Sequence, residues 1–168
     1  MSETVPTNEL HRIVPTVLIY KNDPQRGLVY FLAKRAMYKK VMPGKWGTIG
    51  GGMSTSDYIH LPYSTEGSKQ WYGPVERALR REVKEESNLE IGKPEFLTDL
   101  TFIRPDGVPV LCLSYFAPYK SEKVVLAEEH TECAWVTVEE ATKYDLIDGI
   151  LGEIREIDEI LRKRKNLV

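Results

Sequence analysis

Three glutamates, Glu82, Glu85 and Glu86, stand close together near the middle of the chain, in the segment RREVKEES. Carboxylate oxygens are the ligands that hard divalent cations such as Mg²⁺ and Mn²⁺ prefer. A cation held by them can activate a water molecule and neutralise the charge of a phosphate group. Two hypotheses follow: a metal site that acts on a phosphate compound, and an ordinary solvated acidic surface on a helix.

The three carboxylates are expected on one helix that spans residues 74–87. Pro74 suits the first helical position, where its missing N–H has no intrahelical partner to lose. At about 100° per residue, Glu82 and Glu86 fall within about 20° of Val75, in the middle of the apolar stripe. A carboxylate buried without a partner is strongly disfavoured. The pattern therefore favours a divalent cation as the partner of these side chains.

Composition excludes several other classes of protein. The chain has 168 residues, of which 42% are hydrophobic and 29% are charged, with a formal net charge of −2 and only two cysteines. These values are typical of one globular domain, here residues 1–168, and argue against a disulfide scaffold or a protein drawn to nucleic acid by bulk charge. The sequence shows neither a secretory signal nor a membrane span, so we expect a cytoplasmic protein without a membrane partner.

The elements that position the glutamates form a mixed pattern. Strands are predicted at residues 13–20, 28–33, 46–49, 95–103, 108–118 and 134–136. Thr137 and Glu140 match a capping box that opens a brief helix, and apolar residues at spacings of three and four predict a final helix over residues 145–165. This order predicts an α/β fold in which a mixed sheet is covered by helices.

The region from the glycines to the glutamates resembles the Nudix hydrolase family. Residues 81–86 match its R-E-U-x-E-E motif at every specified position, where U is an apolar aliphatic residue. Asn88 stands where the family motif has glycine, and residues 46–52, WGTIGGG, are similar to its W-x-x-P-G-G segment with Ile49 in place of proline. The resemblance covers roughly residues 12–165 and implies a single domain with the Nudix α/β/α sandwich.

Two departures from the family motif concern its first glutamate. The position of that glutamate falls on Gly73, which has no carboxylate. Twenty-one residues separate Gly51 from Gly73 where the motif has five, so roughly sixteen residues are inserted. Asp57 and Glu66 lie in the resulting loop of about residues 53–72, and the sequence does not select either as a replacement. Because the loop joins the glycines to the helix, we expect it at the mouth of the site, contributing to substrate choice.

The resemblance also implies roles for individual residues. It makes Glu82, Glu85 and Glu86 metal ligands or water-activating groups, with Mg²⁺ or Mn²⁺ as the cofactor. A carbonyl of Gly50 or Gly51 is the expected backbone ligand, although a tight turn explains these glycines equally well. Family members often supply one more glutamate from a loop near the last strand. Glu129 fits that placement best, and its alternative role is that of an ordinary acidic surface residue.

Substrate-binding candidates come from two other segments. Residues 26–45 contain six lysines and arginines and no acidic residue. Arg35, Lys39 and Lys45 are the candidates there for phosphate contacts, against the alternative of a solvated basic loop. Tyr58 is the candidate for stacking on a nucleobase, although aromatic residues of the insertion could equally pin the loop to its own domain. His130, beside Glu129, is expected at the surface.

The resemblance implies a metal-dependent hydrolase that uses water to cleave a pyrophosphate bond in a nucleoside triphosphate or a nucleoside diphosphate derivative. The alternative is a Nudix-fold module that binds a nucleotide without cleaving it, which the missing first glutamate favours. We expect a small nucleotide as the partner and no extended nucleic-acid binding, because the basic stretch is short. A homodimer is kept as one alternative for the oligomeric state.

Overall fold

The structure, a computed structural model, describes residues 10–166. The two ends of the expected domain, residues 1–9 and 167–168, lie outside the described residues. The strands are β1 (Arg12–Asp23), β2 (Gly27–Arg35), β3 (Trp46–Gly47), β4 (Ile49–Gly50), β5 (Glu90–Ile91), β6 (Glu95–Ile103), β7 (Pro109–Ser121) and β8 (His130–Val136). The helices are a 3₁₀ turn, η1 (Thr55–Asp57), and three α-helices, α1 (Pro74–Ser87), α2 (Val138–Ala141) and α3 (Ile150–Lys165).

Strand β1 is central to an 8-stranded mixed sheet. It pairs in parallel with β7 and antiparallel with β2 and the short strand β4. Strands β3 and β8 pair with β2, whereas β5 and β6 pair with β7. Since β4 contains Gly50, the first of the three glycines, this pairing fixes the glycine loop to the middle of the sheet.

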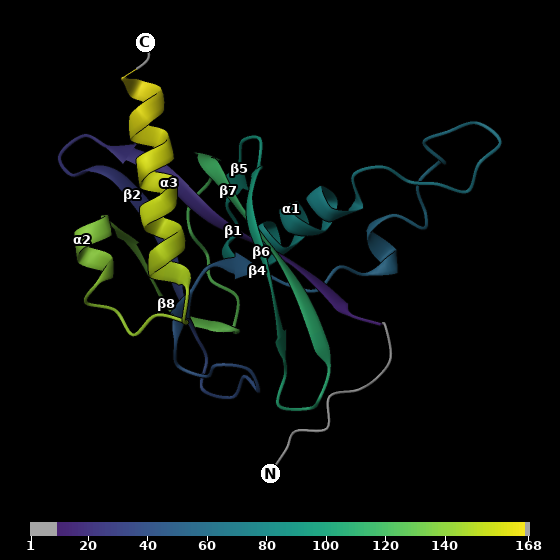
Figure 1. The fold of residues 1–168 in the computed structure, drawn as a ribbon, viewed down its shortest axis with the longest axis horizontal. Coiled ribbons are helices and arrows are strands. Elements are labelled where there is room, and N and C mark those ends of the chain that lie inside the picture. Colours follow the sequence, from purple (N-terminus) through teal and green to yellow (C-terminus); the bar gives the residue numbers. More distant parts are fainter. Residues whose placement is uncertain (1–9, 167–168) are drawn as a thin grey trace.

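Helices cover both faces of the sheet. On one face, Leu79 and Val83 of α1 pack in a core cluster with strand residues such as Val17 and Phe31. On the other face, Ile154 and other apolar residues of α3 pack in a second cluster, which α2 completes. Figure 1 shows α3 and α2 lying across one side of the strands. This arrangement confirms the expected α/β/α layering.

Helix α1 spans the residues that the sequence predicts. It begins at Pro74 and ends at Ser87, and Asn88 adopts the left-handed conformation at its C-terminal cap with φ of 60°. An asparagine tolerates this backbone better than most residues, which explains why it can replace the glycine of the motif. Thr137 and Glu140 likewise make both hydrogen bonds of the predicted capping box.

Two elements begin several residues away from their predicted starts. Helix α3 begins at Ile150 and not at 145, because the backbone of residues 145–147 pairs with the strand residue Trp46: Trp46 N donates to Asp145 O at 2.9 Å and Ile147 N donates to Trp46 O at 2.8 Å. Strand β8 begins at His130 and not at 134, since its first residues pair with β2 although their side chains are polar. Backbone pairing across the chain overrides the local pattern in both cases.

The inserted residues form an arm that extends away from the body of the molecule (Figure 1). Its aromatic side chains pack on one another: the ring centroid of Trp71 lies 5.2 Å from that of Tyr58 and 5.0 Å from that of Tyr63. Trp71 Nε1 also donates to the carbonyl oxygen of Leu61 at 2.9 Å. The arm is therefore held together largely by its own contacts.

Removing a core side chain of α3 tests this packing. Ile157 is fully buried, and Ile157→Ala should lower the free energy of unfolding by about 2–5 kcal/mol, because the lost methyl groups leave a cavity. Ile160→Ala, at a partly buried position of the same helix, should cost less than half as much. Urea unfolding followed by circular dichroism measures both changes, and equal losses would contradict the assigned orientation of α3.

Candidate active site

The glycine loop and helix α1 meet at the carboxylates of Glu82 and Glu86. Glu86 is buried at 6% exposure, and its Oε2 accepts a hydrogen bond from Gly50 N at 3.1 Å. A Cβ atom at Gly51 would lie 2.4 Å from the carboxylate of Glu82, closer than atoms can approach. Glycine is therefore required at position 51 for Glu82 to occupy its place.

Arg81 ties the insertion to this pair. Its Nε donates to Asp57 Oδ1 at 2.6 Å, and its Nη2 donates to the carbonyl oxygen of Gly52 at 3.2 Å. Its Nη1 reaches the carboxylates of Glu82 at 2.8 Å and Glu85 at 2.9 Å. One guanidinium thus connects the start of the insertion, the glycine loop and two of the three glutamates.

Glu129 and His130 approach Glu86 from the other side. The loop that carries them is fixed by Ala127 N, which donates to Glu86 O at 3.0 Å. Glu129 Oε1 accepts from Lys39 Nζ at 2.6 Å, and its carboxyl group also lies within hydrogen-bonding reach of Glu86. His130 is buried, with Nε2 3.3 Å from Glu86 Oε2, but neither ring nitrogen has a well-oriented hydrogen bond to a described residue.

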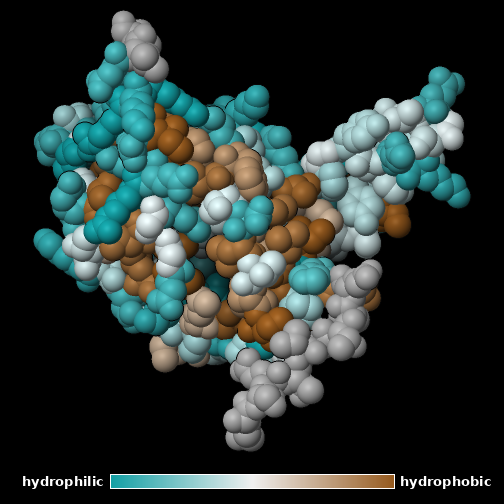
Figure 2. Space-filling view, viewed as in Figure 1, coloured by the Kyte–Doolittle hydropathy of each residue, from teal (hydrophilic) through white to brown (hydrophobic). Residues whose placement is uncertain are grey.

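Glu82, Glu86 and Glu129 line one cavity of about 760 Å³. Its acidic lining residues are Glu82, Glu86, Glu129, Asp148 and Glu153. Its basic lining residues are Arg12, Arg35, Lys39, Lys40 and Arg104. Figure 2 shows a hollow on this side of the molecule, with hydrophobic surface beside it. The volume is in the range of cavities that enclose a small organic ligand.

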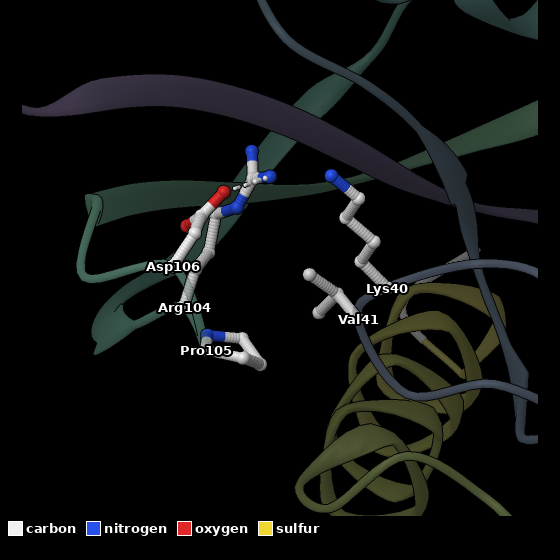
Figure 3. A pocket seen from close by; sticks show the side chains of 5 residues that line it. All are labelled: Lys40, Val41, Arg104, Pro105 and Asp106. Carbon is white, nitrogen blue, oxygen red and sulfur yellow. Dashed lines mark hydrogen bonds and ion pairs between the residues drawn. The ribbon is translucent and has the colours of Figure 1, made fainter.

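A smaller cleft of about 310 Å³ adjoins the basic side of the cavity. Lys40 and Arg104 line both hollows and extend from opposite sides of this cleft, as Figure 3 shows. Arg104 Nη2 donates to Asp106 Oδ2 at 2.7 Å, whereas its buried Nε has no hydrogen-bond partner among the described residues. Positive charge therefore gathers at this end.

Burial and neighbouring charges shift the titration of several cavity residues. Burial raises the pKa of Glu82 above its ordinary value, although Arg81 acts in the opposite direction and Glu86 and Glu85 reinforce the rise. The hydrogen bond from Lys39 lowers the pKa of Glu129. Burial lowers the pKa of Arg35, a residue that also feels the negative charge of Glu86 and Glu129. The site thus holds several carboxylates close together where they are partly shielded from water.

Comparison with known protein families tests the resemblance to the Nudix hydrolase family. The family model of the NUDIX domain matches residues 11–154. The chain belongs to the NUDIX domain family. Membership confirms the resemblance drawn from residues 46–52 and 81–86, and with it the expectation of an enzyme of the Nudix pyrophosphohydrolase type.

Individual relatives agree with the family assignment. Nucleoside triphosphatase NudI of Escherichia coli is 28% identical over 131 residues, which cover 70% of this chain and 79% of that protein. NudI of Klebsiella pneumoniae is 30% identical over 131 residues, which again cover 70% of this chain and 79% of that protein.

None of the described helices has the length and apolar character needed to cross a lipid bilayer.

Solved structures show the same Nudix fold. A MutT NUDIX hydrolase from Burkholderia pseudomallei superposes with a TM-score of 0.65 at 21% identity, over 88% of this chain and 98% of that one. The NUDIX domain of Shewanella oneidensis NrtR, complexed with ADP ribose, superposes with a TM-score of 0.69 at 15% identity, over 92% and 90% of the two chains.

The Nudix cavity gathers most of the residues that the sequence singles out. Gly50, Gly51, Glu82, Glu86, Glu129, Arg35 and Lys39 all line it. Glu85 does not line it, because its carboxylate is more than half exposed and pairs with Arg81. The roles assigned to these residues stay predictions, whereas their convergence on one cavity is a property of the structure.

Two expected substrate contacts lie elsewhere. Lys45 does not line the cavity, because its ammonium group forms an ion pair with Asp145 on the segment that precedes α3. Tyr58 packs on Trp71 within the arm, which is the alternative that the sequence left open for it. None of residues 53–72, all described by the structure, lines the cavity. These placements correct the expectation that the insertion lies at its mouth.

The donor chemistry of the site fits a divalent cation in part. Glu82 and Glu86 supply hard carboxylate oxygens beside the carbonyls of the glycine loop, and Glu129 lies next to them. Within residues 10–166, however, no three side chains of His, Cys, Asp or Glu are grouped closely enough to hold a metal ion on their own. A cation here would therefore depend on backbone oxygens and on ligand atoms as well as on these glutamates.

Sequence reasoning missed several residues of the site. His130 was expected at the surface, and the polar start of β8 gives no sign that its first residue is buried. Arg12 and Thr16 were not singled out, although they are four positions apart in β1 and so share one face of the sheet. Val14 lies between them on that face, so no alternation of polar residues in the sequence marked these two positions.

Replacing Asp57 tests the connection to Arg81. The hydrogen bond from Arg81 is the main cause that lowers the pKa of Asp57 in the folded protein. The stabilisation is therefore present above the unfolded pKa of about 3.9 and is lost as the pH falls through the lower folded value. Asp57→Asn should cost about 2 kcal/mol at pH 7, because a buried charged hydrogen bond is weakened.

Thermal unfolding of the wild-type protein and Asp57→Asn between pH 7 and pH 2.5 measures this effect. The difference in Tm should shrink below about pH 4, where this carboxyl group begins to take up a proton in the unfolded chain, and should vanish as the pH falls through the lower pKa of the folded protein. Glu159→Gln, which removes an exposed ion pair with Lys163, is the matched control and should change Tm little. A difference for Asp57→Asn that stays constant down to pH 2.5 would rule out the charge of this carboxylate as its cause.

Gly51→Ala tests the close approach of Glu82. The added methyl group would displace the carboxylate at the end of a flexible side chain, so the protein should still fold. Nucleotide hydrolysis should fall by about tenfold or more, because a misplaced catalytic group loses its orientation. Gly152→Ala, at an open position of α3, should keep full activity and gain about 0.5–1 kcal/mol of stability. Unchanged kcat/KM in Gly51→Ala would contradict the claim that Gly51 is needed to position the Glu82 carboxylate for catalysis.

Proposed function

We propose that this Nudix protein is a divalent-metal-dependent hydrolase that cleaves a pyrophosphate bond of a nucleoside triphosphate or of a nucleoside diphosphate derivative. Water is the nucleophile. The observation that carries the proposal is the single cavity in which Glu82, Glu86 and Glu129 face Arg35 and other cations. Carboxylates suit the handling of a cation and a water molecule, and guanidinium and ammonium groups suit the phosphates.

The proposed cofactor is Mg²⁺ or Mn²⁺. Glu82 and Glu86 would hold the ion together with a carbonyl of Gly50 or Gly51, and Glu85 would join them after release from Arg81. When bound, the ion would activate water and neutralise charge on the phosphates. Glu129 is proposed as the further catalytic carboxylate, oriented by Lys39 through a hydrogen bond of 2.6 Å.

The proposed roles of the chain's own residues follow from their places around the cavity. Arg35 is held by a hydrogen bond from its Nε to Val41 O at 2.9 Å, and it lines the cavity near Glu86 and Glu129. Its guanidinium therefore suits a phosphate contact close to the carboxylates. Lys39 would divide its charge between Glu129 and the substrate.

A second candidate function is a module that binds a nucleotide without cleaving it. Gly73 at the position of the first motif glutamate favours it, and the NrtR domain that shares the fold was solved with ADP ribose. Against it stand the complete motif at residues 81–86 and the buried carboxylates beside the cavity. Tight nucleotide binding without any phosphate release in Mg²⁺ or Mn²⁺ would select this second function.

Oligomeric state and location stay predictions. A homodimer would suit the long edge strand β6, which pairs only with β7 among the described strands and exposes Phe96, Leu100 and Ile103. Light scattering of the purified chain decides between a dimer and a monomer. The proposed location is the cytoplasm.

Glu86→Gln tests the proposed chemistry. Hydrolysis of nucleoside triphosphates and ADP ribose should need Mg²⁺ or Mn²⁺, and the substitution should lower kcat by about 100-fold or more, because the neutral amide neither holds a cation nor accepts a proton. Metal should also raise the Tm of the wild-type protein and not that of Glu86→Gln, since binding to the folded state stabilises it.

Glu76→Gln is the matched control on the same helix. Glu76 forms an exposed ion pair with Arg80 and does not line the cavity, so this variant should keep its kcat and its response to metal. A protein that hydrolyses none of these nucleotides, or a Glu86→Gln variant with wild-type kcat, would refute the proposed function.

A further inference from the structure

The cavity continues beyond the glutamates onto an apolar stretch of the sheet. Cys112 of β7 pairs with Val14 of β1 on one side and with Leu100 of β6 on the other. One step along the same face, Val110 pairs with Phe102. All five side chains line the cavity. Such a surface suits the face of a planar aromatic ring.

A buried carboxylate stands at one end of this stretch. Glu153 of α3 is 9% exposed and lines the cavity. Its Oε1 accepts a hydrogen bond from Ser114 Oγ at 3.2 Å, and Ser114 lies 3.4 Å from the hydroxyl of Thr16. Among the described residues, Ser114 is the only side chain that hydrogen-bonds to Glu153, and none of them pairs it with a cation.

Glu153 therefore has more hydrogen-bonding capacity than the protein uses. A carboxylate has about four lone-pair sites, and an isolated buried carboxylate is costly. Burial raises the pKa of Glu153, with Ser114 acting in the opposite direction. Replacing Glu153 by an apolar residue would serve the packing of α3 better, so the carboxylate is better explained by a ligand that brings N–H donors to it.

Glu153 and the glutamates of α1 are separated by about the length of a nucleoside. Gly50, which bonds to Glu86, pairs with Thr16, and Thr16 pairs with Ser114. Because neighbouring strands are about 4.8 Å apart, Ser114 lies about 10 Å across the sheet from Gly50. A base at Glu153 would thus leave its sugar and phosphates over the glycine loop.

We propose that Glu153 is the base-recognising residue of this cavity, and that it accepts hydrogen bonds from two adjacent N–H groups of a guanine-type base lying on the apolar stretch of Val14, Leu100, Phe102, Val110 and Cys112. The proposal rests on the proposed function for the phosphate end of the ligand. It adds a specificity-determining residue and a class of base.

The choice of guanine follows from the edges of the bases. A carboxylate offers only acceptors, and guanine presents its ring N1–H beside its amino N2–H, so each oxygen of Glu153 would meet a donor. Adenine and cytosine present one amino donor beside a ring nitrogen that is itself an acceptor. Uracil presents one N–H between two carbonyl oxygens. These three bases would place an acceptor against the carboxylate.

The charges of the cavity agree with this orientation. Arg35 and Lys39 lie near the glutamates of α1, and Lys40 and Arg104 lie at the cleft of Figure 3. No basic residue makes an ion pair with Glu153 among residues 10–166. Anionic phosphates are thus favoured away from Glu153, and the donor-bearing base is favoured beside it.

Calorimetric titration of GMP, AMP, CMP and UMP in the presence of a chelator tests the inference without turnover. The wild-type protein should bind GMP about tenfold or more tightly than the other three, the discrimination typical of a two-donor contact to one side chain. Glu153→Gln, which keeps shape but presents one donor and one acceptor, should reduce this preference to within about threefold. Glu156→Gln, at an exposed position of the same helix, is the matched control and should keep it.

The kinetic counterpart separates recognition from chemistry. In Glu153→Gln, KM for GTP should rise by about tenfold while kcat and Tm stay near those of the wild-type protein. A preference that survives in Glu153→Gln, equal affinity for the four nucleotides, or no measurable binding of any of them overturns the inference. A protein that prefers GMP but hydrolyses nothing would keep this inference and refute the proposed function. A protein that hydrolyses nucleotides without preferring any base would keep the proposed function and refute this inference.

Discussion

The guanidinium of Arg81 is the interaction on which the geometry of the site depends. It binds Asp57 at the start of the insertion, the carbonyl oxygen of Gly52 in the glycine loop, and the carboxylates of Glu82 and Glu85. A rigid fork with several donors can satisfy partners from three segments at once, which an ammonium group could not. Because these segments share one cation, the helix cannot shift along its axis without breaking contacts to the loop. Glu82 is oriented by the same restraint.

A second constraint concerns how the carboxylates reach the cavity. Helix α1 packs on one face of the sheet, whereas the apolar stretch of the cavity and helix α3 lie on the other. The short strand β4 and the glycines after it form the passage between the two faces. Side chains at Gly50 and Gly51 would collide with β1 and with Glu82. Because the glycines of this loop have no side chains, the carboxylates of α1 can reach a cavity that extends over the opposite face of the sheet.

Local signals in the sequence predicted the parts of the fold that local interactions decide. Pro74, Asn88 and the apolar stripe defined α1, and the box at Thr137 defined the start of α2, because caps and periodicity act within a few residues. The start of α3 and the length of β8 were mispredicted, since both depend on pairing with distant strands. Convergence of the motif glutamates and the glycine loop was predicted through the family resemblance.

Other parts of the site could not be predicted from the sequence. The sequence left open whether Asp57 or Glu66 replaces the first motif glutamate and indicated no partner for Arg81, because nothing local shows which carboxylate of a long loop folds back. Lys45 likewise takes a partner that only the folded chain brings near, and for Tyr58 the sequence could not decide between a base contact and packing within the arm. The burial of Glu153 was also not visible, as an acidic residue in the first turns of a helix is ordinarily exposed.

The parallel pairing of β1 with β7 explains why the arm is tolerated. Thr16 and Ser114 are neighbours across this pair although they are 98 positions apart in the chain, so folding closes a very long loop. The entropic cost of closing a loop grows only with the logarithm of the loop length. The roughly sixteen inserted residues therefore add about 0.2 kcal/mol to that closure. A change in the length of this arm therefore costs almost nothing in loop-closure entropy, provided that Asp57 still reaches Arg81.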